Sequence, residues 1–188
     1  MDLVDTLLES YQIDPRSIPV SRAEIDKIDL DGKVQLYEGD FNNGLRKKII
    51  GAVGYFRIEE YFEAAHSFER AVKAIRRDYD PEKRVVLAEM CAWSFELAKE
   101  FKKSPRSTRG MIEDISWAYS RQAEAYVDII EKKRRSGQDV GDCLEKLKEV
   151  YKKAIELFNS VGINPFTDRR TMYLYQKLHH YVANQNKK

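Results

Sequence analysis

The stretch from Leu45 to Ile75, which reads LRKKIIGAVGYFRIEEYFEAAHSFERAVKAI, decides the fold of this chain. Its apolar residues recur at the i, i+3, i+4, i+7 spacing that places side chains on one face of a helix. The stretch therefore predicts two helices, over about 45–58 and 60–78, that fold back on each other. The first apolar series is Leu45, Ile49, Ala52, Val53 and Phe56, and the second is Tyr61, Ala64, Ala65, Phe68, Ala71, Val72 and Ile75.

The same spacing continues through most of the chain. Asp80-Pro81 and Asn164-Pro165 each place an N-cap before a proline in a first helical turn, and Gly162 suits a left-handed C-cap. No segment shows the period of two that is typical of a half-buried strand, so the predicted class is all-α. The further helices are predicted over about 3–11, 81–103, 109–136, 142–161 and 165–184.

The helical pattern is weakest between the segment 3–11 and Leu45. Ser21 and Glu24 form a capping box, which predicts a short helix that ends near Ile28. Residues 29–44 are rich in Asp, Asn and Gly and are predicted to be mostly loop. The predicted organisation is an acidic N-terminal segment (1–44) with two short helices and a loop, a helical-hairpin domain (45–184) and a frayed basic tail (185–188).

Charge is distributed unevenly along the 188 residues, whose net charge is +2. Residues 1–44 hold ten acidic and four basic side chains, so the remainder of the chain is basic. Two interpretations are open. The acidic segment attracts the basic body within one molecule, or it masks part of a basic surface.

Nothing in the sequence predicts export or insertion into a membrane. No apolar run approaches the roughly 20 residues that span a bilayer. The first five residues carry acid where a secretory signal carries base. Cys91 and Cys143 are isolated within helical patterns and have no CxxC spacing. These features predict a cytoplasmic protein with two reduced thiols.

The central pair of helices resembles a tetratricopeptide repeat. That motif asks for a small residue and an aromatic three positions later in its first helix, followed by A-x3-F-x2-A in its second. Ala52, Tyr55, Ala64, Phe68 and Ala71 fill these positions at the family's spacing. Small residues let two helices approach closely while aromatic rings fill the remaining space, so the pattern has a packing cause.

The resemblance is partial. Lys48 stands where the family places Trp or another large apolar residue, Gly51 replaces Leu, and Arg76 replaces the closing Pro. Later fragments at 119–126 and 147–154 are too far apart for a 34-residue unit. The resemblance implies antiparallel helical hairpins stacked as a tetratricopeptide-like array, and an irregular helical bundle is the alternative.

Such an array implies a non-catalytic interaction module that holds a protein or peptide in a groove lined by the first helix of each hairpin. The family's groove positions correspond here to Arg46, Ile49, Val53 and Phe56. Because Ile49 and Val53 are apolar, the predicted ligand is an apolar helix or strand. The amphipathic segment 3–11 is a candidate occupant, either from the same chain or from the partner in a homodimer.

Nucleic-acid binding is the alternative function, because basic residues gather at three places. The helix dipole favours bases at helix C-termini, which accounts for Lys102 and Lys103 of the first group and for the second group, residues 132–135. It does not account for the third group, which lies in a first helical turn and is followed by interleaved aromatic and basic residues. The groups are Lys102, Lys103, Arg106 and Arg109; Lys132, Lys133, Arg134 and Arg135; and Arg169 and Arg170.

The sequence lacks the common catalytic and metal-binding motifs. It contains no HExxH, P-loop, GxGxxG, GxSxG or EF-hand pattern. His66 is predicted to lie half exposed beside the core. His179 and His180 are neighbours, so they point in different directions on a helix and cannot chelate together. The sequence therefore predicts no enzyme activity, no cofactor and no metal site.

Overall fold

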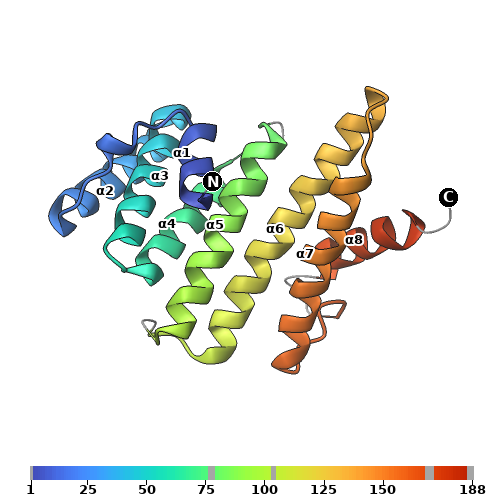
Figure 1. Cartoon of the computed structure of the whole chain (residues 1–188). Coiled ribbons are helices and arrows are strands. Elements are labelled where there is room, and N and C mark those ends of the chain that lie inside the picture. The colour runs from blue at the N-terminus through green and yellow to red at the C-terminus, as the bar shows by residue number, and fades with distance from the viewer. Residues whose placement is uncertain (1, 76–78, 103–104, 168–171, 186–188) are drawn as a thin grey trace. The chain divides into compact units, whose positions relative to one another are not determined.

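The computed structural model describes residues 2–75, 79–102, 105–167 and 172–185 (Figure 1). Within these ranges every regular element is a helix, which confirms the predicted all-α class. The elements are α1 (Leu3–Ser10), the 3₁₀ helix η1 (Pro15–Ser17), α2 (Arg22–Glu38), α3 (Phe41–Arg57), α4 (Tyr61–Ala74), α5 (Pro81–Glu100), α6 (Thr108–Arg135), α7 (Gly141–Ser160) and α8 (Met172–Gln185).

The chain folds into two compact units, residues 1–105 and 106–188. The first holds α1 to α5 and the second holds α6 to α8. The ends of α5, α6 and α7 lie within one turn of their predicted positions. The predicted boundary at residue 45 falls inside α3, and Arg76 lies outside the described residues.

α2 corrects the prediction of a short helix that ends near Ile28. The helix continues to Glu38 and is closed by Gly39, whose φ of 87° is the left-handed conformation that suits a helix end. Asp40 then caps α3 by accepting a hydrogen bond from the backbone N–H of Asn43. A turn of two residues therefore replaces most of the loop predicted over 29–44.

The reason for this difference is packing between α2 and α3. Asp29 and Gly32 favour loops by propensity, but both are buried on the face of α2 that meets α3. A Cβ atom on residue 32 would lie 2.9 Å from the backbone nitrogen of Lys48, so glycine lets the two helices approach closely. Tertiary contacts here override local helix propensity.

Within the first unit, α2 to α5 pack as neighbours in chain order, as Figure 1 shows. α3 and α4 are the hairpin predicted from the central stretch. The residues that carry the resemblance lie in its core: Ala52, Ala64, Phe68 and Ala71 have no exposed area, and Tyr55 is buried.

The N-terminal helix packs on its own unit. α1 contacts α5 and buries Val4, Leu7 and Leu8. At its C-terminal end the hydroxyl of Tyr11 donates to the carbonyl oxygen of Lys83 at 3.1 Å. The apolar face of the predicted segment 3–11 is thus covered within the same chain.

The second unit is an α6–α7 hairpin with α8 packed on both helices. Tyr175 of α8 is fully buried, and its hydroxyl donates to the carbonyl oxygen of Ser116 at 3.4 Å. The predicted start of the last helix at Pro165 is wrong. Asn164 accepts hydrogen bonds from the backbone N–H groups of Phe166 and Thr167, so these residues form a turn before the described part of α8.

None of the described helices is long and apolar enough to cross a membrane.

Candidate functional site

Lys48 is fully buried in the first unit although its side chain carries an ammonium group. It lies on the face of α3 that packs against α2. Its Nζ donates to the carboxylate of Asp29, to the carbonyl oxygen of Asp29 at 3.4 Å and to the hydroxyl of Ser67 at 3.3 Å. An ammonium group has three N–H donors, so each of them has an acceptor.

Asp29 joins three helices. Its Oδ1 accepts from Lys48 of α3 and from the hydroxyl of Ser67 of α4, while its Oδ2 lies 4.0 Å from Nη1 of Arg70. We call Asp29, Lys48 and Ser67 the buried cluster. The cluster ties α2, α3 and α4 together through groups that are costly to leave unpaired in an apolar interior.

Burial lowers the pKa of the Lys48 ammonium, because desolvation disfavours the charged form. The hydrogen bond and the charge of Asp29 act in the opposite direction, and the nearby charges of Arg70 and Lys33 lower the pKa further. The net direction is downward. The cluster therefore balances one desolvated cation against a single carboxylate.

Gly51 provides the space in which the cluster forms. It lies one turn after Lys48 on α3, and a Cβ atom there would be 2.9 Å from the Cβ atom of Asp29. The residue that departs from the repeat motif thus lets Asp29 approach α3 closely enough to reach the ammonium group.

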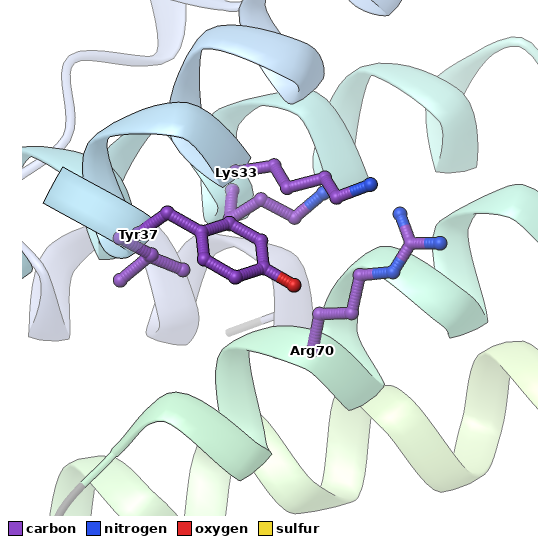
Figure 2. Close-up of a pocket in the computed structure, with 5 residues that line it drawn as sticks. Lys33, Tyr37 and Arg70 are labelled. Carbon is purple, nitrogen blue, oxygen red and sulfur yellow. The ribbon is translucent and has the colours of Figure 1, made fainter.

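A pocket of about 270 Å³ opens beside the buried cluster. Figure 2 shows the charged ends of Lys33 and Arg70 lying close together, with the hydroxyl of Tyr37 directed toward Arg70. We call this the α2–α4 pocket, since its walls come from α2, α3 and α4. The lining residues are Lys33, Leu36, Tyr37, Lys48 and Arg70.

An apolar stripe runs along the outer face of α2. Leu30, Val34 and Tyr37 recur at the i, i+4, i+7 spacing, and their exposed fractions are 58%, 45% and 84%. The buried residues of α2, Ile25, Asp29 and Gly32, lie on the opposite face. We call Leu30, Val34 and Tyr37 the α2 stripe. Three large exposed apolar side chains in a row on one helix face are typical of an interaction site.

The four predicted groove residues do not form one open surface. Ile49 and Val53 have no exposed area, so they are core residues here. Arg46 is exposed, and Phe56 is half-buried with its ring against Trp93 at a centroid distance of 4.8 Å.

The N-terminal segment runs along this face of α3. Arg46 donates to the carbonyl oxygen of Gln12 at 3.0 Å, and Arg57 donates to that of Pro15 at 3.2 Å. These two arginines bracket positions 49 and 53 on α3, and Ile13 is buried between the two contact points. The chain itself therefore lies where the resemblance placed a ligand.

The first predicted basic group is divided between the two units. Lys102 belongs to the first unit and is exposed. Arg106 and Arg109 belong to the second unit, and each forms an ion pair with an acidic residue of α6. Lys103 lies outside the described residues.

The second basic group, residues 132–135, forms the last turn of α6, where the helix dipole favours cations. The guanidinium of Arg134 lies over the ring of Tyr181, 5.8 Å from its centroid. Arg169 and Arg170 of the third group lie outside the described residues.

The pocket and the α2 stripe were missed by sequence reasoning because the prediction ended α2 near Ile28. Two signals for them are present in the sequence. Leu30, Val34 and Tyr37 have helical spacing. Lys48 interrupts the apolar series of α3, and a cation buried at such a position needs a carboxylate beside it.

Other side-chain clusters add no further site. In the described part of the chain, no group of three or more His, Cys, Asp and Glu side chains could hold a metal ion. Cys91 is buried, Cys143 is partly exposed, and neither forms a disulfide. Comparison of the chain with family models, with curated proteins and with solved structures finds no match in any of the three.

Proposed function

We propose that this chain is a non-catalytic protein-interaction module that binds an amphipathic helix of a partner along the α2 stripe. The exposure of Leu30, Val34 and Tyr37 on one helix face is the observation that carries the proposal. A partner helix with apolar residues at matching spacing would remove these side chains from water, which is the usual driving force for such docking.

This surface differs from the groove that the resemblance implies. The corresponding face of α3 holds two fully buried residues and lies beside the chain's own N-terminal segment. The α2 stripe lies on α2, the first helix of the α2–α5 row. The neighbour of α2 in that row is α3, which packs on the face of α2 opposite the stripe. The stripe is therefore a surface that a partner can reach without displacing any described part of the chain.

The charges beside the stripe define the chemistry of the partner. Lys27 and Lys33 flank it on its two sides, and Arg70 lies next to Lys33 at the α2–α4 pocket. Asp31 on the same helix is paired with Lys47 at 3.6 Å. A partner helix with acidic residues bordering its apolar face is therefore favoured over a basic one.

The test introduces a photo-crosslinking amino acid at Lys27, beside the stripe, in an otherwise native chain. The segment that it labels is mapped in a native lysate, with and without nuclease treatment. A synthetic peptide of that segment is then titrated against the purified protein. We expect the peptide to be an acidic amphipathic helix. The double variant Leu30→Gln, Val34→Gln should weaken its binding at least tenfold, about 1.4 kcal/mol.

Val20→Gln is the matched control, because Val20 is 76% exposed and precedes α2. It should change the affinity by less than twofold. Equal binding by the double variant would overturn the proposal. Capture that is abolished by nuclease would do the same and would favour the basic groups. A dimer of this chain that the double variant abolishes would replace the partner by a second copy.

A further inference from the structure

We propose that the α2–α4 pocket binds a phosphomonoester group, with Lys33 and Arg70 neutralising its charge and the hydroxyl of Tyr37 donating to one of its oxygens. The proposal concerns a small anionic ligand and does not depend on the binding of a partner helix. Tyr37 contributes to both surfaces, with its exposed ring on the stripe and its hydroxyl directed toward Arg70 (Figure 2).

The size of the pocket fits a small group. Its volume of about 270 Å³ lies just below the range of roughly 300–1,000 Å³ that is typical of pockets for drug-sized ligands. Leu36 and the ring of Tyr37 supply an apolar wall for the organic part of the ligand. The polar groups are gathered at Lys33 and Arg70.

The pocket carries a positive charge that the described residues do not balance. The charge of Lys48 is met by Asp29 within the buried cluster. Among the described residues, Lys33 has no hydrogen-bond or ion-pair partner, and Arg70 has one ion pair, the 4.0 Å contact with Oδ2 of Asp29. Two cations are therefore available to a ligand.

This charge matches a phosphomonoester better than a carboxylate. A phosphomonoester carries roughly −1.5 to −2 at pH 7, whereas a carboxylate carries a single negative charge. Arg70 offers a planar fork of N–H donors that suits two phosphate oxygens, and Lys33 adds a mobile ammonium group. Because Lys33 and Tyr37 are one turn apart on α2, both reach the same ligand.

The cations of the pocket repel one another in the absence of an anion. The charges of Arg70 and Lys33 both lower the pKa of Lys48, so the three groups are close enough to interact. A bound dianion relieves this repulsion. The buried cluster holds α2 and α4 to α3, so the groups that bind the anion are positioned in advance.

Calorimetric titration of the full chain with phenyl phosphate, in a low-salt buffer without phosphate, tests the proposal. We expect saturable binding, and at least tenfold weaker binding of benzoate. Lys33→Gln and Arg70→Gln should each weaken the binding of phenyl phosphate at least tenfold. Lys27→Gln removes the same charge from an exposed site on α2 outside the pocket and should change the affinity by less than twofold.

The source of the phosphomonoester is distinguished by a second titration with the peptide Ala-Ala-phosphoserine-Ala-Ala. Tighter binding than phenyl phosphate assigns the pocket to a phosphorylated residue of another protein, and weaker binding assigns it to a free small phosphate. Either order is expected under the proposal. Absence of binding of both ligands at millimolar concentration overturns it, as does equal binding by wild type and Lys33→Gln.

Two controls keep this result separate from folding and from the proposed function. Circular dichroism checks that each variant is folded. Lys33→Gln is expected to fold, because Lys33 is exposed and has no partner among the described residues. The Leu30→Gln, Val34→Gln variant leaves the pocket residues in place and should bind phenyl phosphate with wild-type affinity. Failure of one proposal therefore leaves the other standing.

Discussion

Lys48 shows how a single charged residue can be accommodated in a helical core. Burying an ammonium group costs several kcal/mol, and the cost is offset only where a carboxylate and further acceptors surround it. Asp29 and Ser67 supply these acceptors from the two helices on either side of α3. A shift of α2 along α3 would separate Asp29 from Lys48, so the pair favours one register of these two helices.

Asp29→Asn should destabilise the first unit by about 3 kcal/mol or more, because it leaves a buried ammonium group without a counter-charge. Adding Lys48→Met to it should recover most of this loss, since the double variant contains no buried charge. Urea unfolding measures both. An Asp29→Asn variant whose free energy of unfolding lies within about 1 kcal/mol of wild type would contradict the prediction. So would a double variant whose loss of stability equals the sum of the losses in Asp29→Asn alone and Lys48→Met alone.

The lowered pKa of the Glu69 carboxyl makes the stability of the first unit depend on pH. Burial raises its pKa, but the hydrogen bond with His66 at 2.9 Å and the ion pair with Lys73 at 2.6 Å prevail and lower it to about 2. A folded-state pKa below the ordinary 4.5 means that the stability is present above pH 4.5 and is lost as the pH falls toward 2. The contribution is at most about 3 kcal/mol.

Thermal unfolding between pH 3 and 7 tests this account. Glu69→Gln should lower the melting temperature at pH 7, and its difference from wild type should shrink below pH 4.5. Glu149→Gln removes an acid from an exposed pair with Lys153, which is worth little, so it should change stability slightly at every pH. A difference for Glu69→Gln that is constant with pH would refute the assignment.

At the scale of elements, the contact between α2 and α3 depends on the absence of side chains. Gly51→Ala gains up to about 1 kcal/mol of helix propensity. The added methyl group would, however, lie 2.9 Å from the Cβ atom of Asp29 and push α2 away from α3. We expect a net loss of about 1–2 kcal/mol in urea unfolding, because overpacking a tight contact outweighs the gain in propensity.

Gly110→Ala is the matched control for that substitution. Gly110 also lies in a helix, in the first turn of α6, and the nearest atom to an added Cβ is Oγ of Ser107 at 3.5 Å, an ordinary contact. This variant should be neutral or slightly stabilising. If both substitutions shift the unfolding midpoint equally, close approach of α2 is not what requires glycine at position 51.

The sequence predicts an element well where neighbouring residues determine it, and poorly where contacts distant in sequence determine it. α3, α4, α5, α6 and α7 follow a local apolar periodicity. The sequence predicts α5, α6 and α7 to within one turn, whereas α3 begins at Phe41, before the predicted start at 45, and α4 ends at Ala74, before the predicted end at 78. The second half of α2 depends on contacts with α3, which are distant in sequence, so Asp29 and Gly32 suggested a loop. The α2 stripe and the α2–α4 pocket went unpredicted with it, because both need a helix that continues to Glu38.

At the scale of the molecule, the N-terminal segment completes the first unit. α1 covers α5, and the following residues lie along α3. Leu7, Leu8, Ile13 and Ile18 of this segment are buried. The acidic residues of the segment would by themselves indicate a solvated tail. Its apolar residues nevertheless make it part of the core of the first unit. The two predicted groove residues Ile49 and Val53, on the face of α3 beside this segment, have no exposed area.

Deleting residues 2–18 should therefore destabilise the first unit by at least about 4 kcal/mol, since burying each large apolar side chain contributes roughly 1.5–3 kcal/mol. The uncovered faces of α3 and α5 should bind a hydrophobic dye and promote self-association, which sedimentation velocity detects. A peptide of residues 2–20 added in trans should reverse both effects, and the same peptide with Leu7→Ser and Leu8→Ser should not. A truncated chain that keeps wild-type stability and remains monomeric would show that the fold does not need the segment. The face of α3 beside the segment would then again be a candidate surface for binding a partner.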